Sequence, residues 1–218
     1  GFAWRYPAAK LAAVPAKVSV TSIVHKAEQT TLERPGFLSK DGLTAAEMGT
    51  ALHAFLEHAD FARLAEAKAA GTLDDRQVAV QLTAPEIAEK LDAVCIRRFV
   101  ESEAFAKICA AQQVLRELPF ITALPAGAVL AAQGHEALPA AADAQVLVQG
   151  IADLVLVYPD HLELLDYKTD RRKAESDFLR AYRAQLNLYA IAIEKRFAPK
   201  KVTYKGIYSF ALGKLIEA

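Results

Sequence analysis

The sequence of residues 145–170, QVLVQGIADLVLVYPDHLELLDYKTD, decides the fold of the second half of the chain. It holds two runs rich in aliphatic and β-branched residues, 145–157 and 161–168. The dipeptide Pro159-Asp160 lies between them, and these two residue types are typical of a turn. The pattern therefore predicts a β-hairpin.

The register of this hairpin follows from its symmetry. If Tyr158 and His161 flank the turn, the numbers of paired residues sum to 319, whichever turn type closes the loop. Asp153 then lies opposite Asp166, with Cβ atoms about 5 Å apart. Lys168 shares a face with Asp166, because side chains on a strand alternate between the two faces.

Two opposed carboxylates between apolar neighbours point to chemistry, because they repel each other and are costly to bury. One interpretation is structural: Lys168 neutralises them, or the pair lies at a solvated edge. A divalent cation resolves the conflict better, since Mg²⁺ binds one or two carboxylates together with waters and substrate phosphate. Asp153, Asp166 and Lys168 are therefore predicted to be catalytic, binding a metal and stabilising charge during phosphodiester hydrolysis.

The composition is that of an ordinary globular protein. The 218 residues fit one domain, with 53% hydrophobic and 24% charged residues. Because 26 basic residues balance 26 acidic ones, a wholly electrostatic nucleic-acid binder is disfavoured. A DNA enzyme with a local basic patch remains compatible with this balance. No apolar run approaches the roughly 20 residues that cross a bilayer, so no membrane association is expected.

The start of the chain and its cysteines bear on location. Residues 1–7, GFAWRYP, lack the charged-then-apolar order of a secretory signal and are interpreted as a cut inside a longer chain. Cys95 and Cys109 match no zinc or redox spacing and are expected to be buried, inert thiols. A reducing, cytoplasmic location follows as the default.

The order of elements predicts an α+β fold with a helical layer ahead of a catalytic α/β part. The expected helices are 44–59, 61–71, 83–101, 103–110 and 175–196, with a short one from about residue 21. The expected strands are 113–123, 145–157, 161–168, 202–211 and 214–217. Capping boxes at Thr44–Glu47 and Thr83–Glu86 open two of the helices. Residues 125–144, rich in Ala, Pro and Gly, are expected to form a loop.

His53 is a further candidate residue. It lies on the expected 44–59 helix with Gly49 one turn before it and Glu57 one turn after it, on one face. Gly49 leaves room for another backbone or a ligand to approach. A lone helical histidine is more often structural than a ligand, so the spacing alone leaves its role open.

Three polar residues of the 175–196 helix, Tyr182, Gln185 and Tyr189, lie along one edge of its apolar stripe. They either pack against the sheet with hydroxyls reaching water, or they face the active-site end of the hairpin and contact DNA phosphate. The pattern leaves both interpretations open.

A basic run, Arg171-Arg172-Lys173, directly follows the catalytic strand. Such a run is usually a solvated face. Its place at the mouth of the inferred site favours contact of Arg171 and Arg172 with DNA phosphate.

Taken together, these residues resemble the RecB-like branch of the PD-(D/E)XK nucleases, and within it the C-terminal nuclease domain of AddA-type subunits of bacterial helicase–nucleases. The resemblance covers about residues 18 to 212. The matching motifs are Glu47-x-Gly-Thr-x-x-His53, Glu117-Leu-Pro-Phe120, Val148-Gln-Gly-x-x-Asp153, Leu165-Asp-Tyr-Lys-Thr-Asp170 and Tyr182-x-x-Gln185-x-x-x-Tyr189. Each motif is weak alone, but five in the same order are specific.

The resemblance implies a restriction-endonuclease-like core, a mixed central sheet with flanking helices, and a metal site. It implies that His53, Asp153, Asp166 and the Tyr167 backbone carbonyl hold Mg²⁺, for which Mn²⁺ can substitute. Lys168 would position or activate the attacking water. Gln185 and Tyr189, with Tyr182 beside them, would support the site near DNA. Some relatives carry a cysteine-ligated iron–sulfur cluster, but two cysteines cannot supply its four ligands, so none is expected.

The resemblance also implies a larger enzyme. Residues 1–17 would be an extended segment joining to a helicase region, and residues 18–218 the nuclease domain, helical over about 18–112 and catalytic over about 113–218. No Gly-x-x-x-x-Gly-Lys-[Ser/Thr] phosphate loop occurs, so ATP would bind only in that helicase region. The implied activity is a Mg²⁺-dependent exonuclease that processes double-strand-break ends, preferring single-stranded DNA, with an AddB-type partner protein.

Three alternatives remain. A stand-alone or CRISPR-associated nuclease would share the core, although the aromatic start suits packing on a larger body. A catalytically silent docking domain would have lost the metal carboxylates or the lysine, which are present here. A sugar hydrolase using the Asp153/Asp166 pair would give Lys168 no role.

Overall fold

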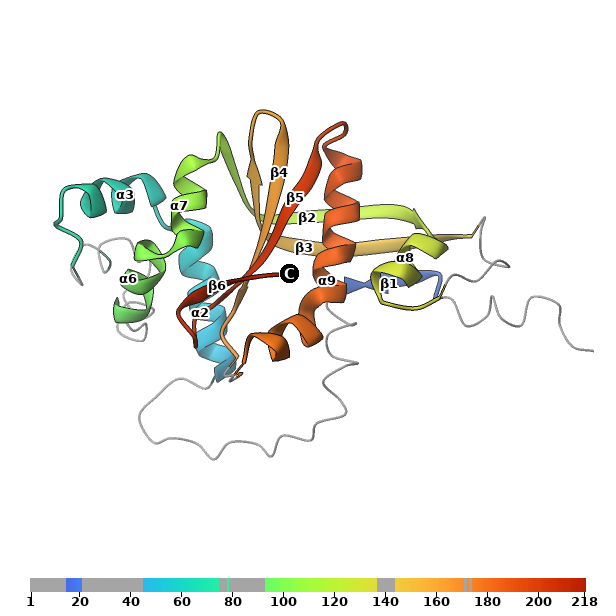
Figure 1. Ribbon diagram of the computed structural model, residues 1–218, viewed down its shortest axis with the longest axis horizontal. Helices are drawn as coiled ribbons and strands as arrows, with labels where there is room; N and C mark the ends of the chain where they lie inside the picture. The colour runs from blue at the N-terminus through green and yellow to red at the C-terminus, as the bar shows by residue number, and fades with distance from the viewer. Residues whose placement is uncertain are drawn as a thin grey trace, which may run out of the picture.

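The computed structural model describes residues 15–20, 45–74, 78, 93–136, 144–170, 172 and 174–218. Its centre is a six-stranded mixed sheet (Figure 1). The strands are β1 (Lys17–Ser19), β2 (Gln113–Pro125), β3 (Gln145–Val157), β4 (His161–Lys168), β5 (Lys201–Ser209) and β6 (Lys214–Glu217). This is the α+β fold that the sequence predicts.

Strand β3 organises the sheet. It pairs along its whole length with antiparallel β2. Its other edge is shared by two strands: parallel β1 pairs with Leu147–Gln149, and antiparallel β4 pairs with Leu154–Val157. Strand β5 then continues the sheet parallel to β4, and β6 closes it antiparallel to β5.

Helices cover the sheet on both faces and enclose two cores. On one face lie α8 (Ala126–Ala132) and the long α9 (Glu175–Arg196), whose buried side chains pack with β3 and β4. On the other face lie α2 (Ala45–His58), α3 (Phe61–Ala69), α6 (Ala93–Glu101) and α7 (Glu103–Ala110) (Figure 1). Aromatic rings fill this second core, with Phe99 at its centre against Phe105, Tyr167 and Tyr208.

The hairpin register predicted from the sequence is confirmed. Leu154 pairs with Leu165 and Val157 with Leu162, so the numbers of each pair sum to 319. The expected boundaries of α7, β3, β4, α9 and β6 agree with the structure.

Two elements differ from expectation. Helix α8 interrupts the stretch that was predicted to be a loop, because Ala126, Val129 and Ala132 bury one helical face despite the neighbouring Pro125 and Gly127. Alanine-rich sequence favours such a helix once that face has a sheet to cover. Strand β1, at the end of the expected extended segment, was not predicted.

The expectation for the cysteines is also wrong. Cys109 is exposed and Cys95 is only partly buried. Several other expectations fall outside the described residues. These are the capping residues Thr44, Thr83 and Glu86, residues 1–14 and the short helix from about residue 21.

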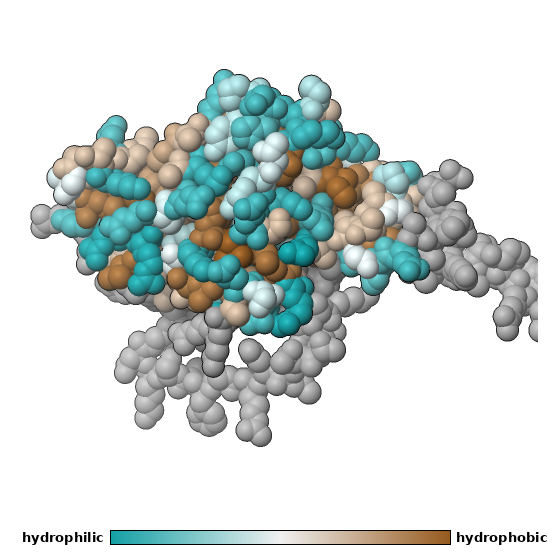
Figure 2. All heavy atoms as spheres, viewed as in Figure 1, coloured by the Kyte–Doolittle hydropathy of each residue, from teal (hydrophilic) through white to brown (hydrophobic). Residues whose placement is uncertain are grey.

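On the face seen in Figure 2, hydrophilic side chains cover most of the surface and smaller hydrophobic areas show between them. Over the described ranges, no helix combines the length and the apolar character needed to cross a membrane.

Candidate metal centre

A gap in the pairing of β3 places the site. The β1 pairing ends at Gln149 and the β4 pairing begins at Leu154, so Gly150–Asp153 have no strand partner on that edge among the residues that the structure describes. A Cβ at Gly150 would lie 2.9 Å from the Tyr189 ring of α9 and 2.9 Å from the Phe120 ring of β2. Glycine is therefore required where α9 crosses the gap.

Asp153 lies at the point where β3 and β4 separate. Its Oδ2 accepts a 2.8 Å hydrogen bond from the backbone N–H of Tyr167, beyond the last ladder pair, Leu154 and Leu165. The Asp153 carboxylate thus accepts the hydrogen bond that a backbone carbonyl of β3 would accept if the ladder continued. Asp166, the predicted partner of Asp153, lies next to Tyr167 on the diverging strand.

His53 of α2 approaches the same point from the helical layer. Its Nδ1 lies 3.3 Å from Glu117 Oε1 and 3.9 Å from Asp153 Oδ2. Ligand atoms of His53, Glu117 and Asp153 all lie within 4.8 Å of one another. Helix α2 comes close because of Gly49, where a Cβ would lie 3.0 Å from Thr169 Oγ1 just after β4.

Glu117 reaches this cluster through an unusual backbone. Its φ of 44° makes it the only non-glycine residue with positive φ among those the structure describes. It lies between the pairs Arg116–Leu154 and Leu118–Ala152, directly across from Asp153. A glutamate held in this conformation costs on the order of 1 kcal/mol or more, and such strain is typical of functional positions.

Both strands lose their two-residue period at this crossing. In β3, Ala152 and Val155 pack in the α9 core while Leu154 packs in the aromatic core. In β2, Leu115 and Leu118 both pack against the α9 core. The ribbon therefore turns over at Glu117 and Asp153. The sequence motif that contains Glu117 did not reveal its role; an acid inside an apolar strand, followed by Leu-Pro, was the available signal.

Asp166 and Lys168 form a buried ion pair beneath this cluster. The Asp166 side chain is 1% exposed and that of Lys168 17%. Gln185 Nε2 of α9 donates to Asp166 Oδ1 over 3.2 Å and to the Tyr189 hydroxyl over 3.0 Å. Gln185 and Tyr189 therefore face the active-site end of the hairpin, and Gln185 fixes the orientation of the Asp166 carboxylate.

Burial and mutual repulsion perturb these acids. Burial raises the pKa of Asp153 although Lys168 and His53 oppose it. Burial, together with the charge of Asp153, raises the pKa of Asp166 to about 6. Burial alone would lower the pKa of Lys168 and of His53, but the nearby carboxylates outweigh it and both pKa values are raised. The site concentrates negative charge that invites a cation.

Tyr182 links Lys168 to the chain beyond β4. The Lys168 Nζ lies 4.7 Å from the centroid of the Tyr182 ring, within range of a cation–π contact. The Tyr182 hydroxyl donates to Asp170 Oδ2 over 3.0 Å. Arg172 pairs with the same Asp170 oxygen over 2.5 Å. Arg171 lies outside the described residues.

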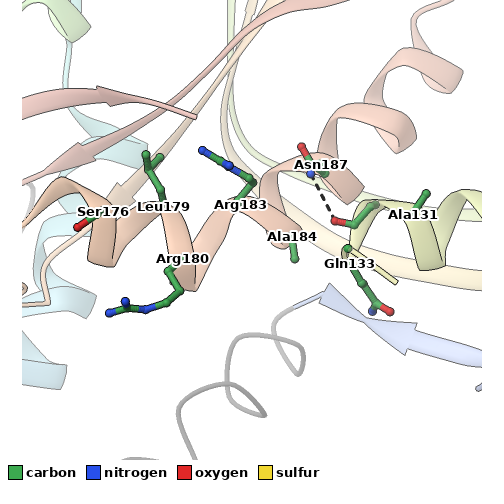
Figure 3. Close-up of a pocket in the computed structure, with 10 residues that line it drawn as sticks. Ala131, Gln133, Ser176, Leu179, Arg180, Arg183, Ala184 and Asn187 are labelled. Atoms are coloured by element: carbon green, nitrogen blue, oxygen red, sulfur yellow. Dashed lines mark hydrogen bonds between the residues drawn. The ribbon is translucent and has the colours of Figure 1, made fainter. Parts of the chain in front are cut away.

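Two other arginines of α9 lie elsewhere. Arg180 and Arg183 line a pocket of about 500 Å³ between α8 and α9, together with Gln133 and Asn187 (Figure 3). Tyr182, Gln185 and Tyr189 are buried, whereas Arg180 and Arg183 are exposed. The buried residues contact the Asp166–Lys168 pair or one another, whereas Arg180 and Arg183 line the separate pocket.

The donor set fits a divalent cation. One imidazole nitrogen and two carboxylates, those of Glu117 and Asp153, lie within 4.8 Å of one another. Asp166 is not in this group and pairs with Lys168, although its charge acts on Asp153 and His53. The buried acids have raised pKa values, which a bound cation would lower again. Oxygen-rich sets of this kind suit Mg²⁺ or Mn²⁺ better than softer metals.

Comparisons with known proteins identify relatives of this chain. Residues 26–214 match the family model described as the PD-(D/E)XK nuclease superfamily. Relatives named as subunits of an ATP-dependent helicase/nuclease occur in Desulforamulus reducens (32% identity, covering 98% of this chain and 18% of the relative) and Moorella thermoacetica (37%, 89% and 15%). A third, from Acetivibrio thermocellus, is 34% identical over 98% of this chain and 18% of its own length.

The chain thus spans less than a fifth of the length of these relatives. Among solved structures, one titled "Crystal structure of SSO0001" aligns over 91% of this chain and 73% of its own, with a TM-score of 0.34 and 9% identity. That similarity is too low to support an argument.

Proposed function

The chain belongs to the PD-(D/E)XK nuclease superfamily, and on that basis we propose that it is a Mg²⁺-dependent deoxyribonuclease whose site lies in the gap of β3. One observation carries the proposal. Two acids, the buried Asp166 and the partly buried Asp153, meet the partly buried Lys168 and an imidazole where two paired strands separate. A merely structural ion pair would need neither His53 nor the strained backbone of Glu117.

The metal ligands proposed are His53, Asp153, Asp166 and the Tyr167 backbone carbonyl, with Glu117 added from the structure. Bound Mg²⁺, or Mn²⁺ in its place, would supply Lewis acidity at the phosphate. The cluster is open to solvent on one side, because the His53 and Glu117 side chains are 34% and 26% exposed. A phosphodiester can therefore reach the cluster from that side.

Lys168 acts as a cation in this proposal. The carboxylates of Asp166 and Asp153 outweigh burial and raise the pKa of Lys168, so its side chain is an ammonium at neutral pH in this structure. Its N–H groups can donate to the attacking water or to a phosphate oxygen, where negative charge grows in the transition state. Tyr182 contacts the ammonium on one side, and Asp166 pairs with it on the other until metal binds.

The relatives support a wider proposal about the parent enzyme. They are named as subunits of an ATP-dependent helicase/nuclease. We infer that this chain is the nuclease domain of such a protein and acts as an exonuclease on break ends. ATP would bind elsewhere in that enzyme, which would also contain an AddB-type partner. The helicase part of that enzyme would deliver a DNA strand to this site and so raise the effective concentration of the substrate there.

A cleavage assay tests the nuclease proposal. End-labelled single-stranded and duplex DNA are incubated with the chain in Mg²⁺, in Mn²⁺ and in EDTA. We expect metal-dependent cutting that Lys168→Ala abolishes. Lys107→Ala is the matched control, because Lys107 also pairs with an acid of β4, Glu163, over 2.9 Å but far from the cluster. Absence of cleavage by the unaltered chain would contradict the proposal and favour a docking domain. Equal cleavage by Lys168→Ala would contradict the role proposed for Lys168.

A further inference from the structure

An apolar face of β2 and β3 leads away from the metal centre. Four large hydrophobic side chains are exposed among the described residues, and three of them lie on this face: Ile121 at 64%, Ile151 at 50% and Leu147 at 37%. The two strands extend beyond the helical layer of α2, α3, α6 and α7 (Figure 1). Clustered exposed hydrophobics of this kind mark a binding surface.

Strand register makes this face continuous with the site. Pro119 pairs with Ile151, two residues from Glu117 and two from Asp153 respectively. The next pair along the same face joins Ile121 to Gln149. At about 3.3 Å per residue, the first pair lies about 7 Å and the second about 13 Å along the strands from Glu117 and Asp153. A shallow pocket along this path is lined by Ser19, Pro119, Phe120, Ile121, Gln149, Gly150 and Ile151.

The charges around this face suit a polyanion. Its outward residues include no acid; they are Lys17, Ser19, Pro119, Ile121, Ala123, Pro125, Gln145, Leu147, Gln149 and Ile151. Two exposed cations border the outer edge of β2, where Lys195 donates to the Ala123 carbonyl over 2.7 Å and Arg196 to the Pro119 carbonyl over 2.9 Å. They also block this edge against pairing with another strand.

We propose that this face is the track on which single-stranded DNA lies beside the scissile phosphate, with its bases against Ile151, Pro119 and Ile121. The inference rests on the proposed nuclease function and adds the substrate form. A phosphate held at the acids places the adjoining nucleotide within reach of the first apolar pair. The exposed bases of a single strand bury apolar area there, with Gln149 and Ser19 as hydrogen-bonding partners for base edges or sugars.

Duplex DNA fits the face poorly. Its bases are paired and stacked inside, so a flat aliphatic surface would meet only charged backbone. A protein occupant would equally cover apolar area, but its docking would not depend on the bases of a DNA strand. That difference decides the experiment.

The test removes bases and side chains in turn. Oligonucleotides carry single abasic positions one, two and three nucleotides to either side of the preferred cut. Binding is measured by fluorescence anisotropy in the Lys168→Ala background with CaCl₂, so that no strand is cut. The protein variant is Ile121→Ser with Ile151→Ser. Val94→Ser is the matched control, since Val94 is the remaining exposed large hydrophobic among the described residues, at 44%, on α6.

We expect each lost base on one side of the cut to weaken binding about fivefold, with little effect on the other side. In the double variant the same base losses should have almost no effect, while Val94→Ser behaves like its parent. Equal losses in both proteins, or none in either, would overturn the proposal. Unchanged DNA binding combined with loss of association with the remainder of the enzyme would show that the face is a protein interface. Cleavage by the unaltered chain tests the nuclease function separately.

Discussion

The two ends of β3 serve different purposes. Residues Leu154–Val157 pair on both edges and are buried. Residues Gln145–Asp153 include both buried and exposed positions, and among the described strands Gly150, Ile151 and Ala152 pair only with β2. The change falls at Asp153, where the ribbon of β2 and β3 turns over.

The contrast explains where charge can be placed. Within a fully paired ladder, a carboxylate would meet apolar neighbours on all sides and be costly to bury. Where the ladder stops, backbone amides and open space become available, and Asp153 binds the Tyr167 amide. The buried half of β3 holds the strand rigidly, so the acids at its end keep a fixed geometry.

The largest expected effect comes from removing the acids at the open end. Asp166→Ala should lower cleavage by roughly a thousandfold or more and remove measurable Mn²⁺ binding, because it deletes a carboxylate that Gln185 orients. Gln185→Leu should lower cleavage less, since the carboxylate remains. Isothermal titration with Mn²⁺ and the cleavage assay measure both. Full Mn²⁺ affinity in Asp166→Ala would remove this residue from the metal centre.

Substitutions in the buried core should affect the stability of the fold, whereas those of the acids affect cleavage and metal binding. Leu156→Ala, at the buried end of β3, should lower the free energy of unfolding by about 2 to 5 kcal/mol. Ile151→Ala, on the exposed face of the same strand, should lower it by about 0.5 kcal/mol or less. Urea unfolding with metal absent compares the two. Similar losses would mean that the exposed face is packed in solution.

The pH dependence of stability should report Asp166. Its folded pKa is raised to about 6 from an ordinary 3.8. Between these values the folded, metal-free chain holds a proton that the unfolded chain has lost, so stability falls as pH rises through this window. The full difference between the folded and unfolded pKa values corresponds to about 3 kcal/mol in the free energy of unfolding.

Thermal unfolding in EDTA at pH 5 and pH 7 measures this effect. The unaltered chain should lose more stability between the two than Asp166→Asn does, and its Mn²⁺ affinity should rise over the same interval because binding displaces the proton. An identical pH response in both proteins would contradict the assignment.

The smallest effect concerns the strained residue. Glu117→Gly should be more stable than Glu117→Ala by about 1 kcal/mol, because glycine adopts positive φ without the steric cost that alanine meets. Both variants should bind Mn²⁺ more weakly, since both lack the carboxylate next to His53. Equal stability of the two would show that the backbone relaxes at this position.

Much of this arrangement could be predicted from local pattern. The hairpin register followed from two aliphatic runs around Pro159-Asp160, although the strands separate before the predicted pair of Asp153 and Asp166. The bounds of helix α9 also followed from a regular apolar stripe, which left the contacts of Gln185 open. These features depend on periodicity, which sequence displays directly.

The missing features depend on long-range geometry. The gap between β1 and β4 along β3 arises because two strands distant in sequence share one edge. The left-handed backbone of Glu117 follows from the crossing that this gap creates, and no local pattern encodes it. Arg172 is a local exception, because its pairing with Asp170, two residues away, was not visible in a basic run.

The most direct test of the proposed metal centre is a crystal of the chain soaked in MnCl₂ and measured for anomalous scattering. We predict one strong peak in the gap of β3, about 2.0 to 2.2 Å from oxygens of Asp153 and Asp166 and from a His53 nitrogen. Lys168 would have moved off Asp166 while staying beside Tyr182. No peak at that position, with Asp166 still paired to Lys168 in saturating Mn²⁺, would contradict the proposed centre.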